Sequence, residues 1–94
     1  MGKGVRKMPE RLAEKLRQIR LAFGLSQSEM LKRLGVEGEI TYNRISDYEL
    51  GKNEPTLLIL LQYARVAGVS METLADDSLD LPAKLPAKPK HSRP

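Results

Sequence analysis

Apolar residues recur at spacings of three and four along most of this chain, and this period predicts five helices. The first predicted helix begins near Pro9, a residue that suits the first helical position, and it ends at Gly24. Its apolar face consists of Leu12, Leu16, Ile19 and Phe23. The pattern as a whole predicts an all-α fold.

The second and third predicted helices are short and follow each other closely. Ser26 and Glu29 have the spacing of a capping box that starts the second helix, and Gly35 suits its left-handed end. The third helix follows Thr41, a suitable N-cap, and ends at Gly51. The inward-facing residues of the pair are Met30, Leu31, Leu34, Ile45 and Tyr48. Two such helices with a glycine-containing turn between them can place the second helix in the major groove of DNA.

The fourth predicted helix, residues 56–68, is apolar on more than one side. Its main face consists of Leu57, Leu60, Leu61, Ala64 and Ala67. Leu58 and Ile59 add apolar surface outside that face, and such a helix is central in its domain or contacts a partner. A short fifth helix follows over residues 70–74, with the ordered core ending by Asp77. We predict a homodimer that uses the fifth helix together with Leu58 and Ile59.

The composition excludes several kinds of site. The 94 residues make one small domain, of a size that often gains stability by oligomerisation. The chain has no cysteine and one histidine, His91, so we expect no catalytic, cofactor or metal site. There is no apolar run long enough to cross a membrane and no signal-peptide core. We therefore expect a cytoplasmic protein that is not an enzyme.

The charge and proline content divide the chain into three parts. We predict a flexible basic arm over residues 1–8, a folded domain over residues 9–78 and a disordered tail over residues 79–94. The tail repeats Leu-Pro-Ala-Lys twice, and proline at this density prevents helix and sheet ladders. The formal net charge is +4, with basic residues gathered at both ends. These ends either contact phosphate or only keep a small protein soluble, and the tail can also hold a protein partner.

Several short motifs, in their order and spacing, resemble the helix-turn-helix family of phage repressors and Cro proteins, also called the XRE family. These motifs are Leu25-Ser26-Gln27, Leu34-Gly35-Val36, Ile45-Ser46 and Glu49-Leu50-Gly51-Lys52-Asn53-Glu54-Pro55. Residues 57–69 and 70–74 are similar to the family's last two helices, so the resemblance covers residues 12–74. It implies a compact, five-helix, lambda repressor-like domain that is usually dimeric and recognises operator DNA.

Two features depart from the family's pattern. The turn between the paired helices is longer by about one helical turn, and residues 37–40 have the character of an insertion. Leu31 stands where the family usually has a small residue, because the two helices cross closely there. We expect the longer turn to move the third helix away and make room for Leu31.

The resemblance assigns the polar residues of this region to double-stranded DNA. The candidate DNA-binding residues are Gln27, Ser28, Thr41, Tyr42, Asn43, Arg44, Ser46, Asp47, Lys52 and Asn53. Asn43 can pair with adenine, and Arg44 can reach phosphate or guanine. Asp47 either accepts a hydrogen bond from cytosine or pairs with a neighbouring basic side chain such as Arg44. The alternative is an ordinary polar helix surface. Lys52 and the N–H groups of its loop are candidate phosphate ligands.

Two further roles come from the same resemblance. Gln27 is expected to contact phosphate and to brace the start of the recognition helix. Arg20 and Glu49 are expected to form a partly buried ion pair that fixes orientation and has no catalytic role.

The leading functional hypothesis is a transcriptional regulator, most simply a repressor that binds a palindromic operator as a homodimer. One alternative is an antitoxin that represses its own promoter and uses the tail to hold a toxin. Another is a protein-interaction module that has lost DNA binding, which the altered turn with Glu37 and Glu39, together with Asp47, favours.

Overall fold

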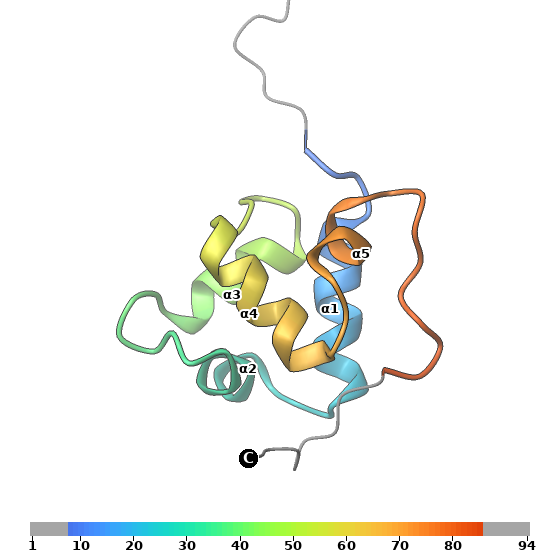
Figure 1. Ribbon diagram of the computed structural model, residues 1–94. Helices are drawn as coiled ribbons and strands as arrows, with labels where there is room; N and C mark the ends of the chain where they lie inside the picture. Colours follow the sequence, from blue (N-terminus) through green and yellow to red (C-terminus); the bar gives the residue numbers. More distant parts are fainter. Residues whose placement is uncertain (1–7, 86–94) are drawn as a thin grey trace, which may run out of the picture.

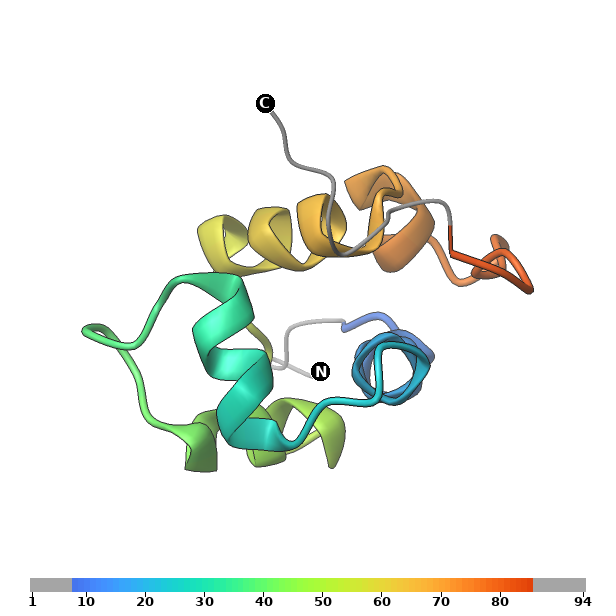
Figure 2. The same cartoon turned by 90° about the horizontal axis from the view of Figure 1, so that it is seen from below.

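The computed structural model describes residues 8–85, and within this range the chain forms five α-helices and no strand. The helices are α1 (Leu12–Ala22), α2 (Gln27–Leu34), α3 (Tyr42–Glu49), α4 (Leu57–Ala67) and α5 (Met71–Ala75). Figure 1 shows α1 and α5 side by side, and Figure 2 shows α4 and α5 on one side of the domain with α3 on the other. The predicted all-α fold of five helices is confirmed.

A single core forms where the five helices meet. Every helix contributes at least one fully buried side chain, and the largest of these are Tyr63, Leu16, Ile19, Met30, Ile45 and Leu74. Burial of one such side chain contributes roughly 1.5–3 kcal/mol relative to leaving it exposed. The core therefore holds the short helices α2 and α3, which are too short to be stable in isolation, in fixed positions.

The predicted helix-start and helix-end signals of α2 are present. The Oγ of Ser26 accepts from the N–H of Glu29 at 3.0 Å, and the Glu29 carboxylate accepts from the N–H of Ser26 at 2.7 Å. Gly35 ends the helix with a φ of +75°. The hydroxyls of Thr56 and Ser70 cap α4 and α5 in the same way, by accepting from N–H groups of the first turn. These local signals were sufficient to predict where α2, α4 and α5 begin.

The start of α1 differs from the sequence prediction. The helix begins at Leu12 and not near Pro9, and no side chain of its own caps it. The cap comes instead from Asp77, whose carboxylate accepts from the N–H of Glu10 at 2.8 Å and of Arg11 at 3.0 Å. These two hydrogen bonds lower the pKa of the Asp77 carboxyl. Asp77, which follows the last helix, thus supplies hydrogen-bond acceptors at the start of the first helix.

The chain after α5 packs against α1, which the prediction of a core ending by Asp77 and a disordered tail from residue 79 did not include. Leu81 and Leu85 are partly buried against the core. The guanidinium of Arg11 binds the carbonyl oxygen of Asp77 at 2.8 Å and the carboxylate of Asp80 at 2.6 Å. The packed region therefore extends past the predicted boundary, because a cation directly before α1 and two leucines anchor the proline-containing segment.

Lys15 is a buried cation that joins α1 to α5. Only 2% of its surface is exposed, and its Nζ donates to the carbonyl oxygens of Thr73 at 2.8 Å and Asp76 at 3.0 Å. Burial, followed by the charge of Arg11, lowers the pKa of Lys15. A cation at these carbonyls satisfies acceptors at the end of α5 that have no partner within the helix.

The outer face of α4 also differs from the prediction. Ile59 is only 4% exposed and belongs to the core, so the prediction that it forms partner-binding surface is wrong. Leu57 and Leu58 are each 71% exposed and form an adjacent pair of apolar side chains at the helix start. The buried face includes Ile59 and Tyr63, which lie one turn apart.

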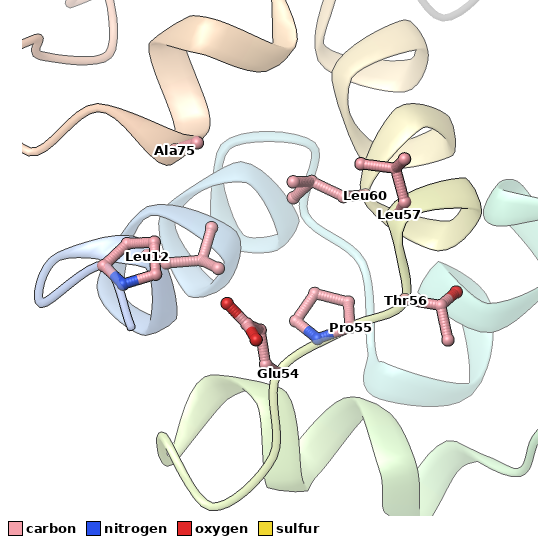
Figure 3. A pocket seen from close by; sticks show the side chains of 8 residues that line it. Leu12, Glu54, Pro55, Thr56, Leu57, Leu60 and Ala75 are labelled. Carbon is pink, nitrogen blue, oxygen red and sulfur yellow. The ribbon is translucent and has the colours of Figure 1, made fainter. Parts of the chain in front are cut away.

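A shallow pocket of about 500 Å³ lies beside Leu57. It is lined by the start of α4, by Pro55 before it, by Leu12 of α1 and by Ala75 at the end of α5. Figure 3 shows Leu12 and Leu57 on opposite sides of this pocket. The exposed leucines thus lie next to a concave, partly apolar surface.

Candidate nucleic-acid interface

The helices α2 and α3 form the paired unit predicted from the sequence, with residues 35–41 as the turn between them. Val36 is buried in this turn, and its carbonyl oxygen accepts from the N–H groups of Glu39 at 2.9 Å and Ile40 at 3.2 Å. Ile40 packs against the core, whereas Glu37 and Glu39 are exposed. The longer turn is therefore anchored by two apolar side chains at positions 36 and 40.

Leu31 lies on α2 and is not fully buried. It is partly buried against the core, on the same helix as the buried residues Met30 and Leu34. A leucine at this position requires more space than the small residue usual in the family. The prediction that the longer turn moves α3 away and makes room for Leu31 stays a prediction.

Three side chains join α1, the start of α2 and the end of α3. The Nε of Arg20 lies 2.7 Å from one carboxylate oxygen of Glu49, and its Nη2 lies 2.9 Å from the other. The amide of Gln27 donates to the same carboxylate at 3.4 Å, and Arg20 also donates to the carbonyl oxygen of Leu25 at 2.9 Å. We call Arg20, Gln27 and Glu49 the bracing network.

The bracing network is largely withdrawn from solvent. The side chains of Arg20 and Glu49 are 14% and 3% exposed, respectively. The hydrogen bond to Glu49 is the main cause that raises the pKa of Arg20, so the guanidinium stays charged. A buried two-point pair of this kind restricts orientation more than it adds stability. The network therefore fixes the end of α3 relative to the start of α2.

The outward face of α3 is polar and accessible. Tyr42 is 51% exposed, and Asn43 and Arg44 are exposed as well. Ser46 is half-buried, and Thr41 precedes the helix without capping it through its side chain. The opposite face of α3 consists of its buried residues Ile45, Tyr48 and Glu49. The arrangement separates a core-facing side from a side that can enter a groove.

The loop after α3 is closed by hydrogen bonds within the protein. The carbonyl oxygen of Asp47 accepts from the N–H groups of Lys52 at 2.9 Å and Asn53 at 3.4 Å, and the N–H of Gly51 donates to Tyr48. The expectation that these loop N–H groups bind phosphate is therefore wrong, because α3 already accepts from them. The side chains of Leu50 and Lys52 are exposed in this loop, and of these two Lys52 carries the positive charge.

Asp47 pairs with Asn53. Its carboxylate accepts from the Asn53 amide at 3.2 Å, and both side chains are half-buried. The sequence suggested that Asp47 pairs with a basic side chain such as Arg44, but the loop brings the Asn53 amide to the carboxylate instead. Both residues hold the loop against α3 in this structure.

The start of α2 contributes the remaining candidates. Ser28 is exposed in the first turn, and Gln27 is half-buried because its amide reaches Glu49. Gln27 thus braces the end of α3, whereas the resemblance implied that it braces the start. Ser26 and Glu29 cap each other at the same end.

One buried polar group near this region was not indicated by the sequence. The hydroxyl of Tyr63 is buried without a hydrogen-bond partner among residues 8–85. Burial, followed by the charge of Glu49, raises the pKa of Tyr63. Tyr63 is fully buried and lies close enough to Arg20 and Glu49 for their charges to affect it.

The described residues, 8–85, contain no cluster of three side chains suited to a metal ion. In the same range no helix is both long and apolar enough to cross a membrane. The comparison with curated proteins finds no match to this chain. The profile of a helix-turn-helix family matches residues 16–74, which include the paired helices, the bracing network and all of α4. The chain therefore belongs to the XRE-type, lambda repressor-like helix-turn-helix family, whose domain binds DNA.

Proposed function

We propose that this protein is a sequence-specific transcriptional repressor that binds a palindromic operator as a homodimer. The observation that carries the proposal is the bracing network, which fixes α2 and α3 while the polar face of α3 stays accessible. This arrangement suits one helix that crosses the DNA backbone and one that reads bases. Such a protein acts at chromosomal DNA, in the nucleoid of the cytoplasm, and needs no cofactor.

Asn43 and Arg44 are the proposed base readers. Both are exposed near the start of α3, where side chains of a recognition helix contact base edges. Asparagine pairs with adenine and arginine with guanine, each through two hydrogen bonds. Tyr42 and Ser46 flank them on the same helix and supply secondary contacts.

The remaining candidates act at the backbone or within the protein. Ser28 and Lys52 are exposed, and their side chains suit phosphate ligands on either side of α3. Thr41 lies at the start of α3, and its hydroxyl is a further candidate ligand for the DNA phosphates. The contact between Asp47 and Asn53 favours a structural role for this pair, which keeps Lys52 in place.

The proposal is tested on the intact chain with an operator selected from a random duplex library. Asn43→Ala should cost about 1–3 kcal/mol at the operator and relax the preference at one base position. Lys52→Ala is the matched control, because a lost phosphate contact weakens binding to all sequences alike and lowers the salt slope by about one unit. If Asn43→Ala has no effect on selectivity, Arg44→Ala must show the base-selective loss. Unchanged selectivity in both variants, with folding intact, contradicts the proposal.

The homodimer rests on the apolar surface at the start of α4. Leu57 and Leu58 are adjacent and each 71% exposed, and the pocket of about 500 Å³ beside Leu57 offers a complementary hollow. In a two-fold dimer both subunits use the same surface. The projecting leucines of one subunit can then enter the pocket of the other, and the reverse. Sedimentation at high protein concentration should give a dimer, and a monomer would remove this part of the proposal.

One observation favours a protein-interaction module instead. The extended turn exposes Glu37 and Glu39 close to the start of α3, and carboxylates repel phosphate. If this alternative holds, the protein fails to bind any duplex at low salt. Glu37→Gln and Glu39→Gln should then restore some duplex binding, because they remove the carboxylates that repel phosphate.

A further inference from the structure

Arg17 lies on the side of α1 that faces the end of α3. Residues 13, 17 and 20 are spaced by four and three, so their side chains occupy one stripe of the helix. Arg20 binds Glu49, the last residue of α3. A Cβ placed on Gly51 would lie 3.9 Å from the Cβ of Ala13. Arg17 is therefore held between two residues that contact the end of α3 and its following loop.

The guanidinium of Arg17 is available to an external anion. Arg17 is exposed, and no carboxylate among residues 8–85 forms a salt bridge with it. Its acidic neighbour Glu14 accepts from the amide of Gln18 at 3.0 Å. Lys52, which follows Gly51 in the chain, is also exposed. Two exposed cations, one on α1 and one in the loop after α3, thus belong to the segments that meet where α3 ends.

We propose that Arg17 is a phosphate ligand that extends the DNA interface from α3 onto α1. The inference rests on the proposed function, because it assumes that α3 lies in the major groove. Figure 2 shows α1 end-on beside α3, so a backbone that passes the end of α3 also passes the flank of α1. Arginine binds a phosphate through two parallel N–H groups and stays charged at any physiological pH. Arg17 adds affinity and orientation without reading sequence.

The test compares Arg17→Ala with Arg65→Ala in the full chain. Arg65 is a matched control, since it is also an exposed helical arginine but lies on α4, in the layer opposite α3. Alanine is favourable in a helix, so both variants should fold, as circular dichroism will show. Fluorescence anisotropy measures binding to the operator and to an unrelated duplex of equal length over a range of salt concentrations.

Arg17→Ala should lower the slope of log K against log salt by about 0.9, and weaken binding by about eightfold at roughly 0.1 M salt. The loss should be equal for both duplexes, Arg17→Lys should keep the slope, and Arg65→Ala should match the wild type. Equal slopes for Arg17→Ala and Arg65→Ala overturn the inference while the proposed function stands. A loss confined to the operator also overturns it, because Arg17 would then read bases. If the wild type binds neither duplex, the proposed function fails and this inference with it.

Discussion

Replacing Glu49 with methionine should destabilise the domain severely. The carboxylate is 3% exposed and holds the Arg20 guanidinium at 2.7 and 2.9 Å, so the substitution leaves a cation at 14% exposure with only the carbonyl of Leu25. Loss of one partner from a buried pair costs about 3–5 kcal/mol. Because Arg20 retains one acceptor and some contact with water, we expect a value near the lower end, about 3 kcal/mol.

The expected loss is large for a domain of this size. Each kcal/mol shifts the melting temperature of a domain of 60–100 residues by roughly 4–8 °C, so Glu49→Met should lower it by roughly 12–24 °C. The assay is urea unfolding followed by far-UV circular dichroism, with thermal unfolding as a second measurement. The free energy of unfolding and its dependence on urea concentration are both recorded, since an altered dependence indicates a change in the unfolded state or a loss of two-state behaviour.

A double-mutant cycle separates the pair from the general cost of substitution. Arg20→Met alone should also be destabilising, because it leaves the Glu49 carboxylate buried with only Gln27 to donate to it. Methionine fills similar volume and adapts its shape, so the double variant should lose much less than either single variant. If Glu49→Met costs less than about 1 kcal/mol, or if the two substitutions are additive, the pair behaves like a surface ion pair and the reasoning is refuted.

Three further outcomes are expected. Tyr63→Phe removes a buried hydroxyl that has no partner and should stabilise the domain by about 1 kcal/mol in urea unfolding; a loss would reveal a hidden hydrogen bond. Asp77→Asn should flatten the acid limb of stability against pH. The lowered pKa of Asp77 gives stability that is present above its ordinary value of 3.8 and lost as pH falls through the lower folded value. Leu58→Glu should shift a dimer to monomer in sedimentation while the melting curve of the monomer is unchanged.

The starts of α2, α4 and α5 were predictable because their capping signals are local. A capping box needs only Ser26 and Glu29, and a left-handed end needs only Gly35. The contact between Arg20 and Glu49 came from the resemblance, since nothing in the spacing of two residues 29 positions apart implies that they meet. Local chemistry therefore determined the elements, and a known family supplied one long-range contact.

Other features depended on packing that the sequence does not display. The helix α4 is apolar on several sides, so its pattern does not reveal that Ile59 faces the core while Leu57 faces solvent. A lysine is normally exposed at the surface, so the sequence alone does not predict that Lys15 is buried. Only the fold places the end of α5 over its Nζ. The N–H groups of the loop after α3, which were expected to bind phosphate, likewise donate hydrogen bonds to carbonyl oxygens of α3. In each case a tertiary contact decided the role.

The capping of α1 by Asp77 means that the limits of the family match and of the cooperative folding unit do not coincide. The match ends at residue 74, but the two residues that lead into α1 donate their N–H groups to a carboxylate three residues further along. A fragment cut after α5 would keep every helix and still lose that cap, the Arg11 contacts and the cover of Leu81. The segment after α5 thus joins the end of the described chain to the start of α1. A protease or partner that opens it would loosen the helix that carries the bracing arginine.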